Sequence, residues 1–193
     1  MNRIIIKTKY SYQPLFRRDF LKLGFLASGA LLTPLPVEAA SNPRQKGIKS
    51  LAFYNTHTDE RIQVDFCRNG NYDTDALTQI NHILRDHRSG EIKAIDVNLL
   101  KLLYAISIKT KSRKPFHVIS GYRSPATNNS LRKNNKGVAS RSMHMLGKAI
   151  DIRIPGFSTR QLRNVARKLK GGGVGYYPKS DFVHMDTGRV RYW

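Results

Sequence analysis

Short runs in which apolar and polar residues alternate constrain the fold of this chain more than any other feature of its sequence. Apolar residues occupy every second position in 61–66 and again in 149–154, where three isoleucines alternate with Ala149, Asp151 and Arg153. Successive side chains of a β-strand point to opposite faces, so this period of two predicts strands that bury one face.

Other segments follow a helical period or form short apolar runs. Apolar residues recur at helical spacing in 75–88, 97–109 and 158–170, and Asp96 and Ser158 are suitable N-caps for the second and third segments. The remaining apolar runs predict further strands at 51–54, 116–119, 174–177 and 182–185. Helices first and then mostly strands predict an α+β domain, an antiparallel sheet with flanking helices.

The N-terminal segment 1–39 has the organisation of a secretory signal. Residues 17–22 read RRDFLK, the apolar run 23–32 follows, and small residues permit cleavage after Ala39. The arginine pair resembles a twin-arginine export signal, and about ten apolar residues are too few to cross roughly 30 Å of hydrocarbon. We therefore predict a twin-arginine signal peptide (1–39), a linker (40–49) and one domain (50–193) without a transmembrane segment, working as a monomer in the periplasm.

Charge narrows the possible partners without selecting one. The 193 residues contain 34 Lys and Arg against 13 Asp and Glu, and removal of 1–39 leaves a net charge of +17. Such a domain is attracted to polyanions, which include nucleic acid, anionic lipid and acidic wall polymers. Cys67 is the only cysteine, which excludes an intramolecular disulfide and a CxxC site; we expect it to be buried in a strand.

Two stretches late in the chain carry residues that bind metals. On the strand 149–154, Asp151 shares a face with Arg153 and lies opposite the isoleucines, and His144 precedes it by seven residues. In 181–188, which reads DFVHMDTG, the same alternation places His184 and Asp186 on one face. Two imidazoles and one carboxylate, with a fourth position left for water, are typical of catalytic zinc. Spacing alone does not distinguish a zinc site from ordinary polar contacts among these side chains.

The same stretches resemble a known family. The pattern SxHxxGxAxD in 142–151, followed by HxD at 184–186, resembles the zinc D-Ala-D-Ala peptidases, whose fold is related to the hedgehog signalling domain. SGYRS at 120–124 strengthens the likeness, and GGGVGYYPKSDFVHMDTG at 171–188 with the terminal RYW is similar to the murein endopeptidase K family. The likeness covers essentially the whole chain.

The resemblance implies a cofactor and a set of roles. It makes His144, Asp151 and His184 the ligands of Zn²⁺, and it gives Arg123 the task of holding substrate or a developing oxyanion. Ser142 and Tyr122 are expected beside the ligands or in contact with substrate. The expected substrate is the stem peptide of peptidoglycan, and the expected reaction is hydrolysis of its peptide cross-links.

The general base remains open between two aspartates. Some relatives carry an acidic residue three positions before the last histidine, where this chain has Asp181. Residues 181 and 184 face opposite sides of a regular strand, so only a bend before Phe182 brings Asp181 to the site. Asp186 is expected on the same face of the strand as His184, as a base requires. Its position also suits a carboxylate that supports His184 or contacts substrate.

Other functions are also compatible with the metal pattern. A carboxypeptidase or dipeptidase that trims D-Ala ends requires the same ligands, and a non-catalytic peptidoglycan-binding module can retain zinc for structure. Nucleic-acid binding is supported by charge alone, because no recognition motif is present, and the predicted export signal leads us to expect no nucleic-acid partner. Which peptide bond is cut is not apparent from the residues.

Overall fold

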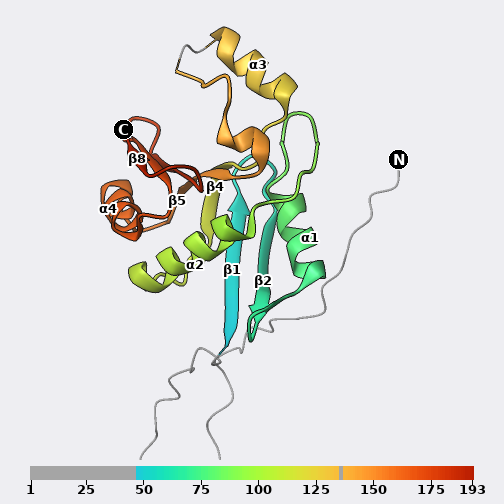
Figure 1. Cartoon of the computed structure of the whole chain (residues 1–193), viewed down its shortest axis with the longest axis vertical. Coiled ribbons are helices and arrows are strands. Elements are labelled where there is room, and N and C mark those ends of the chain that lie inside the picture. The colour runs from blue at the N-terminus through green and yellow to red at the C-terminus, as the bar shows by residue number, and fades with distance from the viewer. Residues whose placement is uncertain (1–46, 135–136) are drawn as a thin grey trace, which may run out of the picture. The chain divides into compact units, whose positions relative to one another are not determined.

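The computed structural model describes residues 47–134 and 137–193. The predicted signal peptide and residues 40–46 of the predicted linker lie outside the described residues. Along the chain the elements are β1 (Ile48–Asn55), β2 (Arg61–Arg68), β3 (Asn71–Tyr72), α1 (Thr74–Ile83), α2 (Val97–Thr110), β4 (Phe116–Ser120), α3 (Pro125–Asn134), the 3-10 turn η1 (Met143–Leu146), β5 (Ala149–Arg153), α4 (Thr159–Leu169), β6 (Gly173–Tyr177), β7 (Phe182–Asp186) and β8 (Arg191–Tyr192) (Figure 1). The first strand thus begins at Ile48, inside the segment predicted as linker.

The strands form one sheet in the order β3-β2-β1-β4-β5-β7-β6-β8. Neighbours run antiparallel except for the pairs β1–β4 and β6–β8, which are parallel. The helices α1 and α2 lie between β1 and β4 in sequence, and a long crossover of this kind is what allows two strands to pair in parallel. The predicted α+β class is confirmed, with a sheet that is mostly rather than wholly antiparallel.

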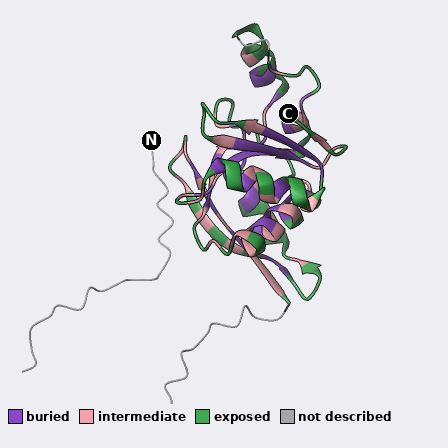
Figure 2. Cartoon of the chain, turned by 90° about the vertical axis from the view of Figure 1, so that its left-hand side faces the viewer, coloured by how far each residue is buried: buried purple, intermediate pink, exposed green. Residues whose placement is uncertain are grey.

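The hydrophobic core lies between the sheet and the helices α1, α2 and α4. Ile150 and Ile152 of β5 and Val183 and Met185 of β7 are fully buried in it, as their alternation predicted. Figure 2 shows the buried residues gathered along the sheet and on the helix sides that face it. The opposite side chains of β5 and β7, which include Asp151 and His184, are therefore directed away from this core.

Two features of the helices differ from the sequence prediction. The helix expected over 75–88 ends at Ile83, because the segment after it folds into a turn around Asp86. The Asp86 carboxylate accepts the backbone N–H groups of Arg88 and Ser124, and its own N–H donates to the Glu91 carbonyl. The helix α3 was not predicted, because its sequence PATNNSLRKN lacks an apolar stripe. The segment that follows Arg123 is therefore a helix, where the sequence predicted none.

Within the described ranges 47–134 and 137–193, no helix has the length and apolar content required to cross a bilayer.

Candidate metal centre

The sheet register brings Asp151 and His184 together. The strands β5 and β7 are antiparallel neighbours, and Asp151 lies directly opposite His184 in their pairing. His184 Nδ1 is 2.9 Å from Asp151 Oδ1, and both residues are buried. Two residues that are 33 positions apart in the sequence thus become cross-strand neighbours on the face opposite the core.

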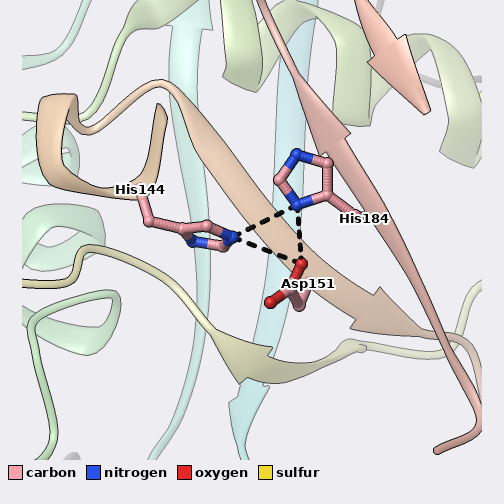
Figure 3. Close-up of side chains that lie close together, drawn as sticks. All are labelled: His144, Asp151 and His184. Carbon is pink, nitrogen blue, oxygen red and sulfur yellow. Dashed lines mark hydrogen bonds and ion pairs between the residues drawn. The ribbon is translucent and has the colours of Figure 1, made fainter. Parts of the chain in front are cut away.

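The third residue, His144, reaches the same point from the turn η1. Ser142 caps this turn, with its hydroxyl accepting the backbone N–H of His144. Gly147 ends the turn at a φ of 66°, and a Cβ there would lie 2.3 Å from the Ala94 carbonyl oxygen, so only glycine fits. His144 Nε2 then lies 3.2 Å from His184 Nδ1 and 3.3 Å from Asp151 Oδ1 (Figure 3).

The donor set fits a metal ion of the zinc type. One atom each of His144, Asp151 and His184 lies within 4.8 Å of the others, and among the described residues this is the one group of three such side chains. His144 Nδ1 donates to the Gly121 carbonyl at 2.7 Å, which leaves Nε2 with its lone pair directed at the other two groups. Because Cys67 is buried in β2, the sulfur-rich set of a structural zinc site is not formed here.

A buried carboxylate, Asp186, orients His184 from behind. Its Oδ2 lies 3.0 Å from His184 Nε2, the nitrogen directed away from Asp151. The side chain of Asp186 is 0 % exposed and also accepts the N–H groups of Gly173 and Gly188 and two bonds from the Arg191 guanidinium. An imidazole that ligates a metal commonly donates its other N–H to such a carboxylate, which sets the tautomer and the ring orientation.

The electrostatics of the centre favour positive charge beside Asp151. Burial raises the pKa of Asp151, but the neighbouring His144 and His184 lower it by a larger amount. The pKa of Asp151 therefore lies well below its usual range. Burial lowers the pKa of His184, and hydrogen bonds to Asp151 and Asp186 outweigh this and raise it to about 9. For Asp186, the donors around it outweigh burial and hold the pKa below its usual range. The carboxylates that hold a proton on His184 would equally stabilise a divalent cation.

Arg123 lies at the edge of the three residues. One of its terminal nitrogens is 3.7 Å from Asp151 Oδ2, and hydrogen bonds of 3.4 Å join the guanidinium to Ser120 and Asn128. Its buried Nε has no hydrogen-bond partner among the described residues. Burial lowers the pKa of Arg123, although the group keeps its charge beside Asp151. A fixed cation at the edge of the centre can bind an oxyanion or a carboxylate.

The backbone that carries Arg123 is held by Asp86, and this yields a stability prediction. Burial raises the pKa of Asp86, but hydrogen bonds from Thr127, Ser124 and Arg88 lower it well below its usual range. We expect Asp86→Ala to lower the free energy of unfolding by about 2–3 kcal/mol at pH 7, since the buried N–H of Ser124 and the partly buried N–H of Arg88 lose their acceptor. A folded-state pKa below the unfolded value of about 4 stabilises the protein above that pH. The difference should therefore shrink as the pH falls below about 4.

Urea unfolding at pH 7 and pH 3 measures this effect. Asp75→Ala removes an exposed carboxylate from the first turn of α1 and serves as a control, with an expected change of at most about 0.5 kcal/mol. An Asp86→Ala protein as stable as the wild type at pH 7 would show that this carboxylate does not hold the loop.

Asp181 is not one of the three grouped residues and makes no bond to them. It occupies the turn just before β7, which begins at Phe182, and has a φ of 50°. This left-handed conformation bends the backbone at Asp181, whereas a residue inside a regular strand would be extended. Its carboxylate accepts the Thr159 hydroxyl at 3.1 Å and lies 3.7 Å from an Arg153 nitrogen. The side chain is 61 % exposed and lines a pocket of about 450 Å³ together with Arg153. Arg153 is two residues beyond Asp151 on the same face of β5, so Asp181 is directed to the face that bears the centre.

The remaining predicted residue and three unpredicted ones complete the surroundings. Tyr122 is buried, and its N–H donates to the Leu84 carbonyl, which fixes the loop between β4 and α3. The unpredicted residues are Arg191, Trp193 and the Gly121 carbonyl; the Trp193 ring centroid lies 5.3 Å from that of His184. The sequence indicated the terminal RYW only through the family resemblance. No spacing of residues indicates that β8 pairs with β6.

Comparison with known proteins gives a consistent set of relatives. A family described as peptidoglycan L,D-endopeptidase MepK matches residues 43–193. The chain is 43 % identical over 178 residues to the peptidoglycan L,D-endopeptidase MepK of Escherichia coli strain K12, which covers 92 % of this chain and 96 % of that protein. It is 38 % identical over 179 residues to the probable peptidoglycan L,D-endopeptidase MepK of Haemophilus influenzae, which covers 92 % and 95 % respectively.

Proposed function

Because the chain belongs to the peptidoglycan L,D-endopeptidase MepK family, we propose that it works with a Zn²⁺ ion held by His144, Asp151 and His184. Membership makes the chain a peptidoglycan endopeptidase and a metallopeptidase. Its site of action is thus the periplasm, and the RRDFLK segment supports export by the twin-arginine route. The bond cut, on the pattern of the relatives' name, is an L,D peptide bond in the cross-links between stem peptides.

One observation carries the proposal. Three side chains from β5, β7 and η1 direct one donor atom each at a common point, and each imidazole has its second nitrogen held by an acceptor behind it. Two nitrogens and one oxygen leave a fourth position for water or substrate, which is the arrangement of catalytic zinc sites. A zinc ion bound there supplies a water of lowered pKa and polarises the carbonyl of the bond to be cut.

The protein's own residues then have separate tasks. The Arg123 guanidinium donates to the oxygen of the scissile carbonyl as its negative charge develops, through the terminal nitrogen that lies beside Asp151. The Asp181 carboxylate accepts a proton from the attacking water and passes it to the leaving amine, so that one water is added across the bond. Thr159 and Arg153 hold Asp181 in place for that transfer.

Asp186 is a positioning residue in this scheme, not the base. Its oxygens are buried and already accept bonds from Arg191, from two backbone N–H groups and from His184, so no lone pair is free for a water proton. We expect Asp186→Asn to weaken zinc affinity about 10–100-fold, because the amide no longer accepts equally from His184 and Arg191. Turnover at saturating zinc should fall much less than affinity.

Competition with a chromophoric chelator measures that affinity. Asp65→Asn changes an exposed carboxylate on β2 in the same way and should leave affinity unchanged. Unaltered zinc binding by the Asp186→Asn protein would remove the supporting role assigned to this carboxylate.

Digestion of isolated peptidoglycan tests the function itself. The purified protein is incubated with the wall polymer and Zn²⁺, with and without a chelator, and the soluble products are identified by mass. We expect loss of cross-linked dimers, with cleavage at an L,D bond, only where zinc is present. Release of terminal alanine would instead indicate a carboxypeptidase, and binding without products would indicate a non-catalytic module.

A further inference from the structure

Positive charge is distributed very unevenly along the mature chain. Residues 40–96 contain eight Lys and Arg and eight Asp and Glu, whereas residues 97–193 contain twenty Lys and Arg and three acidic residues. Those three are Asp151, Asp181 and Asp186, which all belong to the candidate metal centre or its border. Outside that centre, the second half of the chain has no acidic side chain to balance its cations.

The helix α4 concentrates this excess on one face. Its buried side, with Leu162 and Ala166, packs into the core. Its solvent side, which we call the α4 basic face, carries five cations and no acid: Arg160, Arg163, Arg167, Lys168 and Lys170. None of the five forms an ion pair within residues 47–134 and 137–193. A strong amphipathic pattern of this kind leaves the charges available to a partner.

Aromatic side chains hold part of the α4 basic face in place. The guanidinium of Arg163 lies 4.7 Å from the Tyr176 ring centroid, and that of Arg167 lies 4.5 Å from the Tyr192 ring centroid. The Arg163 guanidinium also donates from Nε and one terminal nitrogen to Asn164 Oδ1, which leaves its other terminal nitrogen. A guanidinium held by stacking loses less entropy when it binds a carboxylate. The face is therefore suited to planar anions that pair with arginine through two hydrogen bonds.

The helix also begins at the pocket that Asp181 lines. Ser158, the N-cap of α4, lines the same pocket as Asp181, and the Thr159 hydroxyl donates to the Asp181 carboxylate. A polymer bound along α4 would thus have its neighbouring segments next to Asp181, the proposed base.

We propose that the α4 basic face docks the protein on peptidoglycan through the free carboxylates of stem peptides that are not being cut. This rests on the proposed function, and charge complementarity selects the partner: the cations have no acid of their own, and the polymer repeats carboxylates along its length. An anionic membrane is the poorer match, because a helix that binds at a lipid surface exposes large apolar residues. The large exposed apolar residues of the described chain are Ile92, Leu146, Tyr177, Val190, Tyr192 and Trp193, and none is on α4.

Co-sedimentation with isolated peptidoglycan tests the docking. A triple variant, Arg160→Gln, Arg167→Gln and Lys168→Gln, is compared with a control that removes three charges elsewhere, Lys49→Gln, Arg61→Gln and Arg68→Gln on β1 and β2. At low salt we expect the α4 variant to bind the polymer about tenfold more weakly, and the control within about twofold of wild type. Raised salt should weaken binding of the wild type to the polymer until it approaches that of the α4 variant.

A soluble cross-linked dimer separates docking from catalysis. Both variants should hydrolyse it at the wild-type rate, while the α4 variant digests the insoluble polymer more slowly; circular dichroism checks that each is folded. Equal binding by the α4 variant and wild type, an equal loss in the control, or binding to anionic vesicles but not to peptidoglycan would each overturn the docking. If no protein cleaves the dimer but the α4 variant still loses polymer binding, the proposed function fails and the docking surface stands.

Discussion

Replacing Asp151 by alanine is expected to reduce turnover of a cross-linked wall fragment by about 10⁴-fold or more. Asp151 Oδ1 is the atom that both imidazoles approach, at 2.9 Å from His184 Nδ1 and 3.3 Å from His144 Nε2. Without it the donor set falls to two neutral nitrogens, and Arg123 loses the anion beside it. The zinc content of the purified protein, measured by elemental analysis, should fall in parallel with activity.

Asp65→Ala is the matched control for this loss. It removes an exposed carboxylate that is paired with Arg68 on β2, far from the three ligands in the strand order of the sheet. Its zinc content and turnover should equal those of the wild type. An Asp151→Ala protein that keeps both its zinc and its activity would mean that the ion lies elsewhere or is not used.

Replacing Asp181 by alanine is expected to lower kcat by about 10²–10⁴-fold while zinc stays bound. The carboxylate makes no bond to His144, Asp151 or His184; its partners are the Thr159 hydroxyl and Arg153. Removal should therefore leave the ligands as they are and abolish proton transfer alone. This separates the two aspartates: Asp151→Ala loses metal and activity together, and Asp181→Ala loses activity only.

The measurement is kcat on a soluble dimer with zinc content determined on the same sample. Asp75→Ala, which removes an exposed carboxylate from α1, should leave both unchanged. Normal turnover by the Asp181→Ala protein would exclude this residue as the base. A loss of zinc in that protein would instead make Asp181 a support of the metal centre.

Much of the arrangement followed from the alternation in two short runs. The isoleucines of β5 and the pair Val183 and Met185 of β7 were predicted to face the core, and their burial places Asp151 and His184 on the other face. The sequence contained no indication that β5 and β7 are neighbours, since β6 separates β7 from α4 in the chain and pairs with β7 from the other side. Cross-strand register is a property of tertiary structure, so only the resemblance indicated that the ligands meet.

The features missed by sequence reasoning depend on single residues that act through the backbone. The alternation of a regular strand predicts that Asp181 and His184 face opposite sides of the sheet. The left-handed conformation of Asp181 turns the chain just before β7, so this alternation does not extend to Asp181. The turn at Asp86 ends α1 early because a buried carboxylate takes backbone donors, which a helical period does not reveal. Bends of this kind are set by local geometry that apolar spacing does not encode.

The most direct test of the account is the hydrolysis of a purified cross-linked dimer by protein stripped of metal and then titrated with Zn²⁺. We expect the stripped protein to be inactive, its activity to return with a break at a single equivalent of zinc, and the Asp151→Ala protein to show no return. Hydrolysis at the original rate by the stripped protein, or equal recovery by the Asp151→Ala protein, would contradict it.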